Sequence, residues 1–457
     1  MMTLRGFVLV ITTVLLRHFT VAAAESDDAR AVRIVVGCCV VFCCLGKACA
    51  AIASLRTPSL GAADAWRTFE LRRSQLEWIW VGALPWMLAL SGFGALLAHA
   101  QADGWPQVVS LAVWFVPSLV FLIALDFSAV QLEEDLLHMT SRRRLGPTAG
   151  TGTKSPTVVR WFARVRLGTT GSVIMCLVPV LVAIGAMDIV EACAPGLSMQ
   201  VQGLTAALVL ATVCLTLSPR WMKWWMGARP ILQETHAQRR VAEFSRQLKV
   251  PVPAVLSVTG SPAWQGAALV GWSPAGRQLW LGSSLESQLS HAQLDMVLLH
   301  ELAHLKRGHS WWRLGSILAC GGISVIGMAS TSVSDGPWHQ AYWIFVLAAG
   351  STGLLSWSSR RCELDADAQA CRYAANLCDW AGQRPGWAAG VLCSALARLH
   401  GPAVDAQRWT WLHPTLARRK ASLAKEFELS GQSMDRVDNR CRDETASLRT
   451  KKLLETE

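Results

Sequence analysis

The chain has 457 residues, of which 52% are hydrophobic and 16% are charged, and its mean hydropathy is +0.31. This composition excludes an ordinary soluble globular protein and is typical of membrane proteins. A net charge of +11 at pH 7 is compatible with nucleic-acid binding. The basic residues, however, fall mostly in loops between apolar segments and in the C-terminal third, which membrane topology explains better. We therefore expect a lipid bilayer, and no nucleic acid, as a partner.

Residues 1–218 consist mainly of apolar segments. Residues 1–24 begin with Arg5, an apolar stretch follows, and Ala22-Ala23-Ala24 ends the segment. This pattern fits either a signal peptide with its cleavage site or a short first membrane span. Five further segments have the length of a membrane-spanning helix; they lie at about 32–53, 78–98, 108–130, 170–191 and 200–218. We therefore expect an N-terminal membrane region of about six spans.

The basic residues divide the connecting segments into two kinds. Segment 54–77 carries four Arg, and segment 131–169 carries seven Lys and Arg, whereas 99–107 and 192–199 carry none. Because Lys and Arg gather on the cytoplasmic side of membrane proteins, the basic segments are expected to be cytoplasmic. The sequence thus predicts a multi-pass protein of the cell (inner) membrane whose catalytic segments face the cytoplasm.

Residues 219–425 contain the more polar elements. A basic aromatic patch at 220–225 is typical of a membrane-interface anchor, and a helix is expected at about 233–248, before Pro251. The sequences GAALVGW (266–272) and QLWLG (278–282) flank a Ser-Pro-Ala-Gly turn and predict a β-hairpin. An edge strand at this place could pair with an extended peptide.

The run His300-Glu301-Leu302-Ala303-His304 follows this hairpin. On a helix, residues four apart share a face, so His300 and His304 can present two imidazole nitrogens to one metal ion. Glu301 lies about 100° round the helix, where its carboxylate can reach a water molecule without binding the metal. Two His ligands with a carboxylate base are typical of zinc hydrolases. The motif lacks a third protein ligand.

A candidate for that ligand lies beyond two apolar segments of spanning length, at about 312–332 and 339–357. In the run Ser359-Arg-Arg-Cys-Glu-Leu-Asp-Ala-Asp367, Glu363 and Asp367 are four apart and share a helix face. One carboxylate can bind zinc while the other accepts the free N–H of a zinc-bound His. The alternative is a solvated charged face that closes a membrane span. His309 lies off the ligand face of the first helix, and we expect it to be a boundary residue.

The ordered motifs, with His413-Pro414 and Arg419 as the last, resemble the integral-membrane zinc metalloproteases that include the CAAX prenyl endopeptidases and the HtpX-type bacterial proteases, a gluzincin-like family. The resemblance covers about 220–425. It implies one zinc ion per chain, bound by His300, His304 and Glu363, with Glu301 activating the water and Asp367 orienting a ligand. It also implies that His413 and Arg419 contact the peptide or the oxyanion.

The chain departs from that family at the edge strand. The family usually carries an Asn-Ala-Phe/Tyr-Ala run there, and this chain reads Gly266-Ala267-Ala268-Leu269. We expect Gly266, Ala267 and Ala268 to contact the substrate backbone without the Asn side chain, for which Gln265 is a substitute.

The expected fold is mainly α: a multi-spanning helical membrane protein with a cytoplasmic, gluzincin-like zinc metallopeptidase domain that contains a small β-hairpin. Its domains are a membrane region (1–218), a peptidase domain (219–425) with an inserted membrane hairpin (about 312–357), and a charged, mobile tail (426–457). The expected function is zinc-dependent endoproteolysis of membrane-associated or cytosol-facing protein or peptide substrates.

Three other functions remain open, and the oligomeric state is open as well. The chain could be a signal-sensing membrane protease that cleaves a repressor, similar to the β-lactam-sensor proteases. It could be a scaffold with a structural zinc, although a structural site has no use for the Glu301 base. It could be a transporter or channel, the class that many spans alone indicate.

Overall fold

The computed structural model describes most of the chain between residues 28 and 428. The described residues are 28–60, 62–90, 93–145, 165, 169–196, 201, 205, 208–209, 212, 218–231, 234–258, 266–271, 276–329, 337–377, 385–399 and 412–428. The predictions on residues 1–24, on Gln265 and on the tail beyond residue 428 lie outside these ranges. Helices predominate and one small sheet is present, so the mainly α prediction is confirmed.

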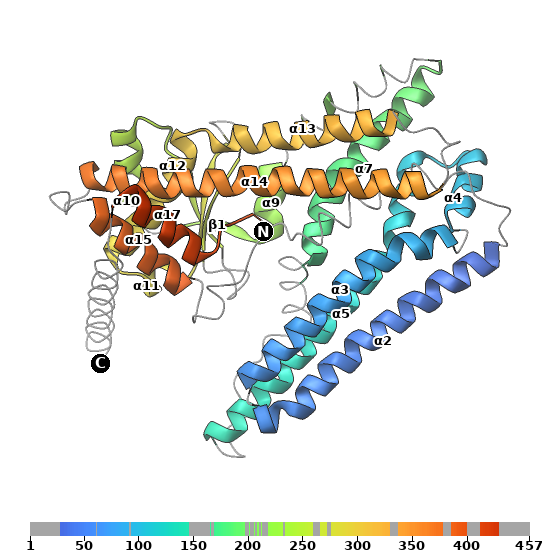
Figure 1. The fold of residues 1–457 in the computed structure, drawn as a ribbon, viewed down its shortest axis with the longest axis horizontal. Helices are drawn as coiled ribbons and strands as arrows, with labels where there is room; N and C mark the ends of the chain where they lie inside the picture. The colour runs from blue at the N-terminus through green and yellow to red at the C-terminus, as the bar shows by residue number, and fades with distance from the viewer. Residues whose placement is uncertain are drawn as a thin grey trace. The chain divides into compact units, whose positions relative to one another are not determined.

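The chain divides into two compact units. One comprises Met1–Val213 with Gly327–Ala348, and the other comprises Cys214–Ile326 with Ala349–Glu457. The first unit contains the helices α2 (Asp28–Leu60), α3 (Ala62–Leu90), α4 (Phe93–Ala102), α5 (Gln107–Leu145) and α7 (Thr169–Cys193). Figure 1 shows α2, α3 and α5 lying along one another as long helices. Aromatic side chains fill the space between α3 and α5, where Trp80 stacks on Phe121 with ring centroids 4.6 Å apart.

Two helical stretches among the described residues are long and apolar enough to cross a membrane. They are Ala31–Arg56 and Gln107–Leu136, and they contain the predicted segments 32–53 and 108–130. These two helices favour association with a membrane. The other predicted spans, and with them the multi-spanning architecture, stay predictions.

The basic segments between the apolar runs are helical where the structure describes them, at 54–60, 62–77 and 131–145, which corrects the prediction of loops there. Helix α2 continues to Leu60, α3 begins at Ala62, and α5 runs on to Leu145. Arg, Glu, Gln and Leu are good helix formers, so a helix continues past the point where its apolar face ends. Hydropathy marks the apolar part of a helix and does not mark its end.

One of the basic residues counted toward the membrane orientation is buried. Arg73 is only 6% exposed; it donates to Glu77 over 2.9 Å and to Asp126 over 2.5 Å, and Thr170 donates to the other oxygen of Asp126. Buried charges persist when they are paired and hydrogen-bonded in this way. Arg73 therefore joins α3 to α5, and it is weak support for the cytoplasmic side of its segment.

The second unit holds the sheet and the remaining helices. Its elements are α9 (Ser218–Met226), β1 (Ala228–Pro230), α10 (His236–Leu248), β2 (Ala254–Val258), β3 (Ala267–Val270), β4 (Gln278–Gly282), α11 (Leu285–Gln288), α12 (His291–Lys306), α13 (His309–Ala329) as far as Ile326, α14 (Pro337–Leu377) from Ala349 on, α15 (Pro385–Leu399) and α17 (Leu416–Glu426).

The sheet has the strand order β1-β2-β4-β3. Strands β3 and β4 pair antiparallel, with Ala268 opposite Trp280, which confirms the predicted hairpin. Strand β2 pairs parallel with β4, and β1 pairs antiparallel with β2; neither strand was predicted. Among the described strands β3 lies at an edge of the sheet, next to α12.

Helix α12 is buried over nearly its whole length. It begins with a capping box, in which Ser290 Oγ accepts the backbone N–H of Gln293 and Gln293 Oε1 accepts that of Ser290. Leu299 and Leu302 pack into a core with Phe244, Leu392 and residues of α14 and α17, and they are fully buried. This packing on several sides fixes the direction of the side chains on the remaining face of α12.

Helix α14 is a single helix of 41 residues. At 1.5 Å per residue it is about 60 Å long, and it contains both the second predicted hairpin segment and the Ser359–Asp367 run. The Ser359–Asp367 run therefore continues the helix of the second predicted hairpin segment, because no helix-breaking residue separates the two parts. Cys320 Sγ of α13 lies 3.5 Å from the Ser351 carbonyl oxygen, so α13 and α14 pack together.

Candidate active site

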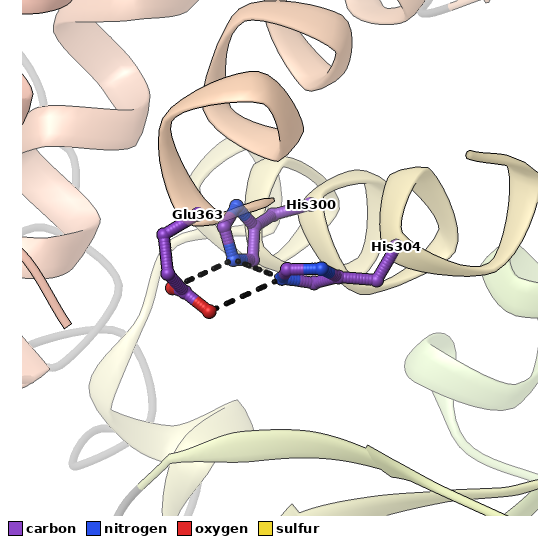
Figure 2. Close-up of side chains that lie close together, drawn as sticks. All are labelled: His300, His304 and Glu363. Atoms are coloured by element: carbon purple, nitrogen blue, oxygen red, sulfur yellow. Dashed lines mark hydrogen bonds and ion pairs between the residues drawn. The ribbon is translucent and has the colours of Figure 1, made fainter. Parts of the chain in front are cut away.

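The three predicted metal ligands lie together in the second unit. His300 and His304 project from the same face of α12, and Glu363 points at them from α14 (Figure 2). His300 Nε2 lies 3.2 Å from His304 Nε2, and Glu363 oxygens lie 3.7 Å from His300 Nε2 and 3.4 Å from His304 Nε2. All three residues are less than 8% exposed. Among the described residues this is the one group of His, Cys, Asp and Glu with metal-binding spacing.

These separations fit a tetrahedral zinc ion. Ligand atoms about 2.0–2.1 Å from the metal are about 3.3–3.5 Å apart in a tetrahedron. The two His nitrogens are 3.2 Å apart, Glu363 Oε1 lies 3.4 Å from His304 Nε2, and Glu363 Oε2 lies 3.7 Å from His300 Nε2, each close to that value. Two imidazoles and one carboxylate are also the ligand set of catalytic zinc sites that keep a fourth position for water.

Glu301 connects α12 to the edge strand. The backbone N–H of Leu269 in β3 donates to Glu301 Oε2 over 2.9 Å, which leaves the other carboxylate oxygen to contact a water molecule. Burial raises the pKa of Glu301, and the nearby His300 opposes that rise. A buried carboxyl with a raised pKa suits proton transfer near neutral pH.

Asp367 contacts His300 at Nδ1, the ring nitrogen that faces away from the other two ligands. Its Oδ1 lies 2.9 Å from His300 Nδ1, although the N–H direction deviates from a straight hydrogen bond. The guanidinium of Arg419, on α17, makes a two-pronged contact with the same carboxylate, with Nε donating to Oδ2 over 2.6 Å. Burial would raise the pKa of Asp367, but Arg419 outweighs it and lowers that pKa. Asp367 thus remains a carboxylate that accepts from Arg419 and lies within ion-pair distance of His300.

The carboxylate of Glu363 has two further partners. His413 Nδ1 lies 3.1 Å from its Oε2, and Arg313, a residue that the sequence analysis did not single out, donates to its Oε1 over 2.9 Å. Burial would raise the pKa of Glu363, but His413 and the neighbouring imidazoles of His300 and His304 hold it well below its usual range. Glu363 is therefore ionised, the form that binds a metal.

The two imidazoles have different electrostatic surroundings. Burial lowers the pKa of His304 to about 4, so this imidazole is neutral at pH 7 and offers a lone pair. Burial also disfavours the charged form of His300, but the adjacent carboxylates of Asp367 and Glu363 raise its pKa to about 9. A metal ion that binds here must displace the His300 proton, as is usual for His ligands.

His309 lies against the site, contrary to its predicted place at a boundary. Helix α12 ends at Lys306, and Gly308 has a φ of +66°, a left-handed conformation that glycine adopts without strain. This turn brings His309, at the start of α13, back toward α12. Its Nδ1 lies 2.8 Å from His304 Nδ1, and the residue is 5% exposed.

The remaining predicted residues lie around this centre. The backbone hydrogen-bonding groups of β3 point alternately toward β4 and away from it. The Gly266 carbonyl accepts from the Gly282 N–H in β4, whereas the Leu269 N–H points away from β4, toward Glu301. By this alternation the backbone N–H and C=O of Ala267 point to the open edge of the sheet, and those of Ala268 point to β4.

Arg419 and His413 differ in exposure. Arg419 is 4% exposed, and its guanidinium contacts the Asp367 carboxylate. The His413 side chain is 47% exposed.

Comparison with known proteins identifies the domain that holds this site. Residues 232–426, the part of the chain that holds this site, match the model of Peptidase family M48, which supports a metalloprotease domain there. The matched segment contains every residue of the site described above. The recognition made from the sequence motifs is confirmed.

Solved structures add a weaker likeness. The chain is similar to the crystal structure of S. mikatae Ste24p with a TM-score of 0.41 and 13% sequence identity, over 85% of this chain and 98% of that chain. A match at this level carries no argument about activity. No curated protein matches the chain.

Proposed function

We propose that this protein is a zinc-dependent endopeptidase that cleaves membrane-associated or cytosol-facing proteins. The observation that carries the proposal is the buried set of His300, His304 and Glu363 with the spacing of a tetrahedral metal site, beside the Glu301 carboxylate. The M48 peptidase domain supports it. In a purely structural zinc site, the buried Glu301 carboxylate, which can act as a general base, would have no role.

His300, His304 and Glu363 would hold one zinc ion per chain. Zinc, when bound, would act as a Lewis acid that polarises the scissile carbonyl and acidifies a water molecule. The chain's own residues supply the rest of the chemistry. Arg313 and His413 hold the Glu363 carboxylate in place and Asp367 holds His300, so both ligands keep their directions when the substrate enters.

Glu301 would move the proton. Its Oε2 is fixed by the Leu269 N–H, and its Oε1 would accept the proton of the attacking water and return it to the leaving amine nitrogen. His413 has an exposed side chain beside Glu363, and its Nε2 would donate to the carbonyl oxygen as negative charge develops there. The Arg419 guanidinium donates to Asp367, which contacts His300. Arg419 would therefore stabilise the negative charge on the carbonyl oxygen indirectly, through Asp367 and His300.

The edge strand β3 would position the substrate. An extended peptide that adds to a sheet edge gains main-chain hydrogen bonds without any requirement on its side chains. Gly266, Ala267 and Ala268 are small, so a peptide backbone can approach them closely. Since Leu269 already donates to Glu301, a peptide paired with β3 would lie beside the catalytic base.

The proposal implies that chelation abolishes proteolysis. Purified full-length protein in detergent is expected to cleave internal bonds of a fluorogenic peptide mixture. Zinc chelation should reduce the rate to background, because the water would lose its acidifying Lewis acid, and added zinc should restore it. A matched sample treated with the chelator already saturated with zinc serves as the control. Cleavage that persists after chelation to undetectable zinc would contradict the proposal.

We also propose that the protein is a multi-pass protein of the cell (inner) membrane with the site on the cytoplasmic side. The two apolar helices and the charge difference between connecting segments support it. A protease-sensitive tag after Glu457 should be digested in inside-out vesicles and protected in right-side-out vesicles. The reverse pattern would place the site on the other side.

A further inference from the structure

His309 and Asp365 lie outside the proposed set of ligands and proton-transfer groups, yet they form a chain of contacts that ends on a ligand. His309 Nε2 lies 3.0 Å from Asp365 Oδ2, and His309 Nδ1 lies 2.8 Å from His304 Nδ1. His304 Nε2 in turn faces Glu363. Both ring nitrogens of each imidazole are thus in contact with a polar atom.

The chemistry of these groups fixes the position of each proton. A carboxylate only accepts hydrogen bonds, so His309 Nε2 must carry the hydrogen that points at Asp365. A neutral His309 then has a bare Nδ1, which accepts, and His304 Nδ1 must carry the hydrogen between the two rings. Consequently His304 Nε2 has a free lone pair, and it is the nitrogen that faces His300 and Glu363.

We propose that His309 and Asp365 are positioning residues that set the tautomer and ring orientation of His304 for metal binding. The inference rests on the proposed zinc site. A ligand His commonly donates its second N–H to a carboxylate, a carbonyl or water; here a second imidazole stands between the ligand and the carboxylate. His300 contacts Asp367 directly, so the two ligands are oriented by two different carboxylates of α14.

The turn at Gly308 is the local structure that makes this arrangement. On an uninterrupted helix, a residue five positions after His304 would be rotated about 140° away from it. Because α12 stops at Lys306 and Gly308 adopts a positive φ, the His309 ring returns to the buried side of His304. Arg307, whose side chain is 51% exposed, reaches the same Asp365 oxygen from solvent, with a distance of 2.9 Å.

The test is a zinc-competition titration of the purified full-length protein against a chromophoric chelator, with thermal unfolding to check the fold. His309→Phe keeps a ring but removes the acceptor, and we expect zinc affinity to fall about 10- to 100-fold. His309→Asn restores an acceptor near the position of Nδ1, and we expect it to recover most of that loss. Asp365→Asn should fall between the wild type and His309→Phe.

The control is Arg307→Gln, which removes the other partner of Asp365 and leaves the imidazole chain intact. We expect it to change zinc affinity by less than about fivefold, as for an exposed ion pair. Wild-type affinity in both His309→Phe and Asp365→Asn would overturn the inference while the zinc site itself stands. If His309→Phe does not fold, wild-type affinity in Asp365→Asn alone overturns it. A wild-type protein that binds no zinc would overturn the site and the inference together.

Discussion

Replacing Glu301 with Gln is expected to lower kcat/KM by about 100- to 10,000-fold, the usual contribution of a general base. The substitution keeps the shape of the side chain and an oxygen that can accept the Leu269 N–H. It removes the negative charge and the basicity that proton transfer requires. Zinc content should remain that of the wild type, since Glu301 is not among the three clustered ligands. The measurement is peptide cleavage together with metal analysis of the same sample.

A matched control for this variant is Glu286→Gln. Glu286 Oε1 also accepts a backbone N–H, that of Ala237, over 2.9 Å, but it lies on α11 outside the ligand cluster. We expect this change to leave cleavage at the wild-type rate. If Glu301→Gln kept wild-type activity with zinc bound, another group would have to be the base.

Replacing Glu363 with Ala is expected to weaken zinc binding by at least about 100-fold, more than the loss of a supporting partner causes. The change removes one of three ligands and leaves the Arg313 guanidinium beside the site without its carboxylate partner, where its charge repels a cation. In thermal unfolding, added zinc should raise the Tm of the wild type and not that of the variant, because a ligand stabilises only the state that binds it.

Glu426→Ala is the control for that experiment. Glu426 is an exposed residue of α17 that pairs with Arg372, so the same truncation is made outside the cluster, and we expect normal zinc binding. Full zinc occupancy in purified Glu363→Ala would show that Glu363 is not the third ligand.

Helical spacing predicted the two pairs of residues at the site, and the family resemblance indicated which carboxylate completes the ligand set. His300 and His304 are four apart on one helix, and so are Glu363 and Asp367. This spacing places each pair on one face whatever surrounds it. The two helices then had to meet, and the structure brings Glu363 to both imidazoles and Asp367 to His300.

The partners that depend on chain turns and long-range packing could not be predicted in this way. His309 was placed off the ligand face because α12 was extended through Gly308 in the prediction. A glycine after Lys306-Arg307 is a helix stop signal, and it was the one local indication of the turn. Arg313 reaches Glu363 only because α13 packs on α14.

The sheet and the basic segments show two further limits of pattern reasoning. Strand β1 has three residues, too few for alternation to stand out. Strand β2 was not recognised because no hairpin turn joins it to β4, and its parallel pairing with β4 is not a local property. Segment 54–77 reads as a polar loop, but Arg73 is buried against Asp126 of α5. Charge alone does not distinguish a solvated residue from one that is paired inside a bundle.

The most direct test of the account is peptide cleavage by the zinc-loaded protein in water enriched in heavy oxygen, followed by mass spectrometry of the products. We expect one heavy oxygen in the new C-terminal carboxyl group of each internal cleavage product, and no products from Glu301→Gln at matched zinc content. Absence of cleavage by the zinc-loaded wild type, or products formed equally by Glu301→Gln, would contradict a zinc endopeptidase built on His300, His304 and Glu363.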